Sequence, residues 1–242
     1  MLKVDNIISI EEILELNNLK IDIISITLKN KSYNEERAVN INEAIKLRKY
    51  IKKDIKFCIE IDNTYTYIEN EKNILKIIKI LKPNYIQLRS NTLISRFIIE
   101  KLRIKNIFII YVSRNSLDRD EEIYWQLPSF ANDTLTLDDN IIENIFLKYN
   151  ISIQVDIMTE YDDSWNILNN DCGKYEDDIT INEIYEFTIK FNTFILLNYS
   201  INNFNKIKNI FKKAVGYSFR LGTKNEIPTH ITPLKNISKI IM

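Results

Sequence analysis

The 242-residue chain is predicted to fold as an α/β protein, a single-domain (β/α)8 or TIM barrel that spans residues 1–242. Short runs rich in β-branched residues alternate with segments of helical period. Most of these runs are apolar at nearly every position, as in strands buried on both faces of a parallel sheet. The alternation repeats eight times. An open doubly wound sheet also alternates, but regular units in a chain near the usual barrel length of about 250 residues favour the barrel.

The apolar runs are the expected strands. They occupy residues 2–4, 22–28, 56–61, 85–90, 107–113, 151–158, 194–200 and 214–221. In a barrel of this kind the carboxyl ends of all strands meet at one face, which carries the active site. A functional site is therefore expected among the side chains that end these runs and in the loops that follow them.

Start signals mark several of the intervening helices. The capping-box pattern, a small polar residue followed three positions later by Glu, occurs at residues 9–12, 40–43 and 180–183. Thr232 followed by Pro233 places a cap residue before a proline at the first position of the last helix. One further helix carries an apolar stripe that should pack against the barrel. The stripe consists of Ile74, Ile77, Ile78 and Leu81.

Two connections are longer than the others, and both follow an expected strand. Residues 114–140 come after the fifth strand and residues 159–179 after the sixth. Long loops on this side of a barrel are more often functional than accidental. The loop at 159–179 is acidic, but its spacing matches no EF-hand. We therefore expect a solvated loop rather than a cation site, and no bound metal.

Composition excludes several classes of function. Lys and Arg together number 33, as do Asp and Glu, so the chain lacks the basic excess of a nucleic-acid-binding protein. No apolar run approaches the roughly 20 residues that cross a bilayer, and no polybasic segment suits a membrane surface. The three glycines form neither a phosphate loop nor a dinucleotide fingerprint, so no nucleotide cofactor is expected. The single histidine, His230, excludes a multi-histidine metal site.

The cysteines and the first residues bear on the compartment. Cys58 lies in an apolar run and Cys172 in a polar loop, which is typical of reduced thiols rather than of a disulfide framework. Asp5 and Glu11 interrupt any apolar core of a signal peptide. A cytoplasmic location is expected.

Several segments, taken in order, carry the pattern of a known family. They are Lys3-Val4-Asp5-Asn6, Arg37-Ala38-Val39-Asn40 with Glu43-Ala44, Gln87-Leu88-Arg89-Ser90, Ile153-Gln154-Val155-Asp156, Gly173-Lys174 with Asp177, Leu197-Asn198-Tyr199-Ser200-Ile201 with Asn205, and Ala214 to Arg220. In order and spacing the whole chain resembles phosphoribosylanthranilate isomerase, the barrel enzyme of tryptophan biosynthesis. The resemblance implies a barrel of the ribulose-phosphate-binding type.

The resemblance also implies a reaction and two catalytic residues. The family carries out an Amadori rearrangement, in which a general acid opens the ribose ring and a general base removes the proton from ribose C2. Asp156 matches the acid of the family, and Asp5 stands where the family has a cysteine base. A partly desolvated aspartate can act as a base, and two nearby carboxylates push their titrations apart so that one stays protonated. A related sugar isomerase of histidine biosynthesis is similar in using two aspartates.

The remaining matched positions imply a binding site for a small phosphorylated substrate. Its candidate residues are Arg37, Gln87, Arg89, Asn198, Ser200, Ser218 and Arg220. Arg37 matches the arginine that binds the substrate carboxylate. The family's paired glycines, which let backbone amides approach the phosphate, are replaced here by Tyr199 and Ser200, and Arg220 replaces a further glycine. Arg220 can instead offer the phosphate a bidentate guanidinium.

Each assignment has a structural alternative. Asp5 would cap the following turn, Asp156 would pair with a neighbouring Lys or Arg, Arg220 would pair with an acid at the barrel rim, and Arg37 would be a surface charge. For the protein as a whole, one alternative is an inactive barrel that serves as a binding or interaction protein. Another is an enzyme of the same fold that acts on a different, less anionic ligand. The oligomeric state is left open by the sequence.

Overall fold

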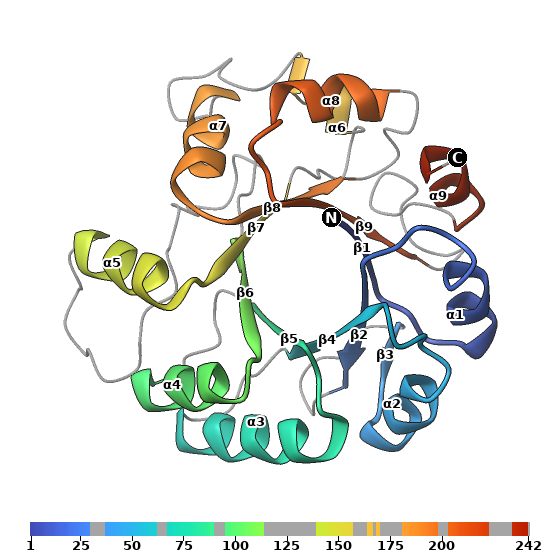
Figure 1. The fold of residues 1–242 in the computed structure, drawn as a ribbon, viewed down its shortest axis with the longest axis vertical. Coiled ribbons are helices and arrows are strands. Elements are labelled where there is room, and N and C mark those ends of the chain that lie inside the picture. The colour runs from blue at the N-terminus through green and yellow to red at the C-terminus, as the bar shows by residue number, and fades with distance from the viewer. Residues whose placement is uncertain are drawn as a thin grey trace, which may run out of the picture.

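The computed structural model describes residues 1–29, 37–61, 67–89, 95–113, 139–156, 164–166, 168–169, 181–197, 203–222 and 234–241. Over these residues the predicted (β/α)8 barrel is confirmed, with a closed ring of parallel strands (Figure 1). The ring consists of β1 (Leu2–Asp5), β2 (Ile23–Leu28), β4 (Lys56–Ile61), β5 (Tyr85–Arg89), β6 (Phe108–Ser113), β7 (Ser152–Asp156), β8 (Thr193–Leu197) and β9 (Gly216–Arg220). Each strand pairs with the next along the chain, and β9 closes the ring by pairing with β1.

One short strand was not expected from the sequence. β3 (Ala38–Val39) pairs in parallel with Thr27 and Leu28 at the end of β2. β1 pairs with β2 only at Ile23 and Ile24, near the start of β2. β3 therefore pairs with the part of β2 that lies beyond the end of β1. Two residues are too short to show a period, which is why the sequence pattern did not reveal this strand.

Helices surround the ring on its outer side (Figure 1). They are α1 (Ile10–Leu16), α2 (Ile41–Arg48), α3 (Tyr67–Leu81), α4 (Arg96–Ile104), α5 (Asp139–Tyr149), α6 (Ser164–Asn166), α7 (Ile181–Lys190), α8 (Phe204–Ile210) and α9 (Leu234–Ile241). The capping boxes at residues 9–12 and 40–43 are both formed. Thr180, Thr232 and Pro233 lie outside the described residues. No helix of the described part is long and apolar enough to cross a membrane.

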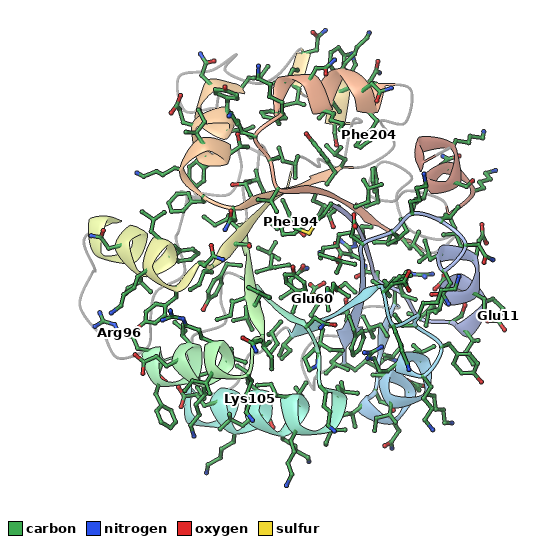
Figure 2. The ribbon with its side chains drawn as sticks, viewed as in Figure 1. Glu11, Glu60, Arg96, Lys105, Phe194 and Phe204 are labelled. Carbon is green, nitrogen blue, oxygen red and sulfur yellow. The ribbon has the colours of Figure 1, made fainter. Side chains whose placement is uncertain are left out.

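The strands separate two apolar layers. The larger core lies between strands and helices and includes the predicted stripe of α3, whose four residues are all buried. A smaller cluster of Ile23, Cys58, Ile110 and Phe194 is separate from this core. Figure 2 shows Phe194 and Glu60 on the inner side of the strand ring, whereas Glu11, Arg96 and Lys105 lie outside it. The inside of the barrel therefore combines an apolar cluster with buried polar side chains.

The buried thiol of Cys58 should make the free energy of unfolding decrease at alkaline pH. Burial raises its pKa from 9.0 to about 12. Above pH 9 the unfolded thiol loses its proton while the folded thiol keeps it, so the free energy of unfolding falls as pH rises toward 12. Urea unfolding of Cys58→Ala between pH 8 and 11 should show a shallower fall than the wild type. Equal slopes would contradict the burial of this thiol.

Candidate active site

Asp5 ends β1 at the carboxyl face of the barrel, as the sequence predicts, and its side chain is buried. Its Oδ1 lies 2.5 Å from Lys3 Nζ, and its Oδ2 accepts a hydrogen bond from Ser218 Oγ at 2.5 Å. Lys3 Nζ also donates to Gln154 Oε1 at 2.8 Å and to Ser218 Oγ at 3.3 Å. We call Lys3, Asp5, Gln154 and Ser218 the Lys3 network. It joins strands β1, β7 and β9 inside the barrel.

The Lys3 network holds a charged pair away from water. Lys3 is 0% exposed and Asp5 is 3% exposed. A buried ion pair is tolerated only when further hydrogen bonds satisfy the remaining donors and acceptors, which Gln154 and Ser218 provide here. Both carboxylate oxygens of Asp5 are bound to side chains of the network rather than to the backbone of the following turn. The geometry thus fixes a carboxylate at the end of the first strand.

A second group of polar side chains fills the neighbouring part of the barrel. Thr27 Oγ1 lies 2.9 Å from Asn6 Oδ1 and 3.2 Å from Glu60 Oε2, and Gln87 Nε2 donates to Glu60 Oε2 at 3.1 Å. We call Asn6, Thr27, Glu60 and Gln87 the Glu60 cluster. Asn6 follows Asp5 directly and adopts a left-handed backbone with φ of 63°, which asparagine tolerates better than most residues. All four side chains are buried.

Sequence reasoning named only some of these residues. It identified Asp5, Gln87 and Ser218, but not Lys3 or Glu60 as members of a site. The available signal was a charged residue inside an apolar strand, as in LKVD and KFCIEI. A charge at an inward-facing strand position needs a buried partner, so this signal favours a polar barrel interior.

Arg37 is buried beside the first helix and forms an ion pair with Glu12. Its Nε donates to the backbone oxygen of Asn6 at 2.9 Å, and its NH1 donates to that of Gly222 at 3.5 Å. Glu12 also accepts hydrogen bonds from the backbone amides of Ile8 and Ser9. Arg37 therefore ties the start of α1 to the carboxyl end of β1 and is not a free surface charge. Its role toward a substrate carboxylate stays a prediction.

The two capping boxes offer a matched test of this ion pair. Glu12→Ala removes both the cap and the partner of buried Arg37, so we expect a loss of about 2–4 kcal/mol in the free energy of unfolding. Glu43→Ala removes an exposed cap without an arginine, and a loss of about 0.5–1 kcal/mol is expected. Urea denaturation of both variants measures the difference. Equal losses would show that the Arg37 pair adds nothing.

The other predicted residues differ in how far the structure describes them. Arg220 ends β9 opposite Asp5 in the register, and its side chain is partly exposed. Arg89 and Asp156 end β5 and β7, but their side chains lie outside the described part of the chain. Asn198 and Ser200 lie outside it entirely. Asn203, the N-cap of α8, makes no side-chain cap bond.

The described residues hold no cluster of three or more His, Cys, Asp or Glu side chains that would suit a metal ion. The charges inside the barrel are instead engaged with side chains, as Asp5 is with Lys3 and Glu60 is with Thr27 and Gln87. What the arrangement offers chemically is two held carboxylates, one ammonium group, three carboxamides and two hydroxyls. Such groups suit proton transfer and the binding of a polar organic molecule.

Solved structures of several enzymes share this fold. Phosphoribosyl anthranilate isomerase from Thermotoga maritima has a TM-score of 0.61 at 12% sequence identity, covering 99% of this chain and 96% of that chain. Thiamine phosphate pyrophosphorylase from Pyrococcus furiosus has a TM-score of 0.54 at 11% identity, covering 99% and 94%. Orotidine 5'-monophosphate decarboxylase from Sulfolobus solfataricus has a TM-score of 0.53 at 14% identity, covering 99% and 96%. No protein-family model and no curated protein matches the sequence, so the likeness is one of fold alone.

Proposed function

We propose that the protein is a divergent phosphoribosylanthranilate isomerase that rearranges N-(5-phosphoribosyl)anthranilate in tryptophan biosynthesis. In this proposal Asp5 is the general base and Asp156 the general acid. The observation that carries it is the buried carboxylate of Asp5, held by Lys3 and Ser218 at the end of β1, where the resembled family has its base. A phosphoribosyl anthranilate isomerase solved with a reduced form of 1-(o-carboxyphenylamino)-1-deoxyribulose 5-phosphate shares the fold at 11% identity.

The ladder supports pairing these two aspartates in one site. Position 5 comes two residues after Lys3 on β1, and position 156 comes two residues after Gln154 on β7. Lys3 and Gln154 meet inside the barrel at 2.8 Å. Because successive residues of a strand alternate between faces, positions 5 and 156 share the inward register of that pair, one step nearer the carboxyl end.

The proposed chemistry needs only these two proton-transfer groups. Asp156 gives a proton to the ribose ring oxygen, which breaks the C1–O bond and leaves a Schiff base. Asp5 then takes the proton from C2, the C2–H electrons form the enolamine, and tautomerisation gives the keto sugar. Lys3 acts as a positioning residue because its ammonium fixes Asp5 Oδ1 at 2.5 Å.

Substrate binding in this proposal follows the remaining predicted residues. The proposed contacts to the ligand come from the seven residues that match the family's binding positions, namely Arg37, Gln87, Arg89, Asn198, Ser200, Ser218 and Arg220. We assign Arg220 to the phosphate, and its position at the end of β9, in register with Asp5, supports this assignment. The reaction calls for no cofactor, nucleic acid or membrane, and a cytoplasmic location suits it.

Complementation tests this function. Expression of the chain in a tryptophan auxotroph that lacks the isomerase should restore growth without tryptophan, and Asp156→Asn should not. Soluble, folded protein must be present in both strains, as judged by immunoblot and by circular dichroism of the purified protein. Failure of the wild type under these conditions would reject the proposal.

A second candidate is an enzyme of the same fold acting on a less anionic ligand. Two observations favour it. Arg37 is already paired with Glu12, and Glu60 adds a buried carboxylate where a substrate carboxylate would be repelled. Turnover of a neutral amino sugar by purified protein that fails to complement the auxotroph would select this candidate.

A further inference from the structure

We infer that the Glu60 cluster is a subsite for sugar hydroxyls, so that the ligand of this barrel carries a polyol or ribosyl group held by side chains of β2, β4 and β5 and of the residue that follows β1. The inference rests on the proposed function only in placing a ligand at this face of the barrel. The resembled family pattern supplied Gln87 as a binding residue and Asn6 only as the last position of its first segment, and it did not include Glu60 or Thr27. Glu60 projects inward from β4, toward the middle of the ring (Figure 2).

The cluster has polar atoms that the described residues leave without partners. Asn6 Nδ2 and Gln87 Oε1 are both buried and make no hydrogen bond within the described part of the chain. Each of these two side chains is only 2% exposed. Buried carboxamides are normally satisfied, so such atoms point to a group that joins them from outside the chain. Turning the Asn6 carboxamide over leaves its oxygen without a partner instead of its nitrogen, so in either orientation one polar atom of Asn6 lacks a partner.

The chemistry of the free atoms selects the ligand. Gln87 presents its amide oxygen, an acceptor, because its amide nitrogen donates to Glu60 at 3.1 Å. Asn6 presents its amide nitrogen, because its oxygen is the atom that contacts Thr27. A hydroxyl group both donates and accepts, so it satisfies either atom. The Glu60 carboxylate opposes an anion. In the recorded orientation of Asn6, its amide hydrogens oppose a metal cation. Neighbouring hydroxyls of a sugar fit this set best.

The position of the cluster agrees with this choice. Asn6 of the cluster directly follows Asp5 of the Lys3 network along the chain, so the two groups adjoin at the end of β1. A sugar whose C2 proton faces Asp5 would therefore direct its hydroxyls toward Asn6, Thr27 and Glu60. Glu60 and Gln87 are then residues that determine specificity for the sugar rather than groups that move the C2 proton.

Calorimetric titration of the full-length protein with D-ribose 5-phosphate and with inorganic phosphate tests the subsite. The wild type should bind ribose 5-phosphate at least about tenfold more tightly than phosphate, since hydrogen bonds to a buried charged group discriminate by this order. In Glu60→Gln and in Gln87→Leu that preference should fall to within about threefold, with phosphate binding itself unchanged. Glu43→Gln, on the exposed start of α2, is the matched control and should keep the preference.

The outcomes are separable from those of the proposed function. If the wild type does not prefer ribose 5-phosphate, or if both cluster variants retain the preference, the subsite is wrong. Circular dichroism and thermal melting establish that each variant is folded, and Gln87→Leu keeps the test open if Glu60→Gln does not fold. If both cluster variants lose the preference while the wild type shows no isomerase turnover, the proposed function is rejected and the subsite stands. Turnover combined with an unchanged preference would reject the subsite alone.

Discussion

Replacing Asp5 by asparagine is expected to lower the free energy of unfolding by about 3–5 kcal/mol, because Lys3 would remain in the barrel as a buried, uncompensated ammonium. Lys3 is 0% exposed, and its Nζ lies 2.5 Å from Asp5 Oδ1. Asparagine keeps the shape of the side chain and can still bond to Ser218, so the loss reports the charge. Urea denaturation at pH 7, followed by circular dichroism, measures it.

A double variant separates this structural role from catalysis. Lys3→Met combined with Asp5→Asn removes both charges, and replacement of a buried ion pair by an uncharged pair is often close to neutral in stability. We expect it to recover most of the loss seen in Asp5→Asn while remaining inactive as an isomerase. If Asp5→Asn alone is as stable as the wild type, the ion pair does not hold the barrel together. If the double variant is no more stable than Asp5→Asn, the loss does not come from the unpaired ammonium.

The second large effect is expected at Gly216, which begins β9. A Cβ built there would lie 2.7 Å from the backbone oxygen of Met1 and 2.7 Å from Cε1 of Phe194. Met1 cannot move aside freely, because its oxygen accepts from Tyr217 N at 2.9 Å and its amino group donates to Val215 O at 2.9 Å. Phe194 is fully buried in the inner apolar cluster. Gly216→Ala should therefore cost about 1–3 kcal/mol through overpacking, and Gly216→Val more.

A double-mutant cycle identifies the cause of that cost. Phe194→Leu destabilises the barrel by itself, because it removes ring atoms from a packed cluster. It also removes the ring that meets the new methyl group. The combination with Gly216→Ala should therefore cost less than the sum of the two single variants. Additive losses, measured as midpoints of urea unfolding, would assign the strain to the Met1 backbone alone, and an unchanged stability of Gly216→Ala would refute the steric account.

The fold was predictable because each strand carries its own signal. Runs such as IISITL and KFCIEI are buried on both faces, so a local apolar pattern is enough to find them. The capping boxes at Ser9 and Asn40 are likewise local and were confirmed. Several strand ends differ by a few residues, as at 214–221 against Gly216–Arg220, because ends depend on pairing partners rather than on composition.

The site was predictable only in part, because it depends on residues that are distant in sequence. The strand-end position of Asp5 followed from the resemblance. The Lys3 network did not, since Lys3 lies 151 positions from Gln154 and 215 positions from Ser218. Only closure of the barrel brings these side chains together. Glu60 illustrates the same limit, because a lone carboxylate in an apolar strand shows neither its partner nor its ligand.

Turnover of N-(5-phosphoribosyl)anthranilate by the purified protein, followed by the loss of anthranilate-type fluorescence, tests the central claim most directly. The wild type should convert the substrate well above the uncatalysed rate. The folded Lys3→Met, Asp5→Asn variant should lose at least about 100-fold, the contribution typical of a general base. A folded wild type without turnover, or a variant as active as the wild type, would contradict the claim that Asp5 carries isomerase chemistry in this barrel.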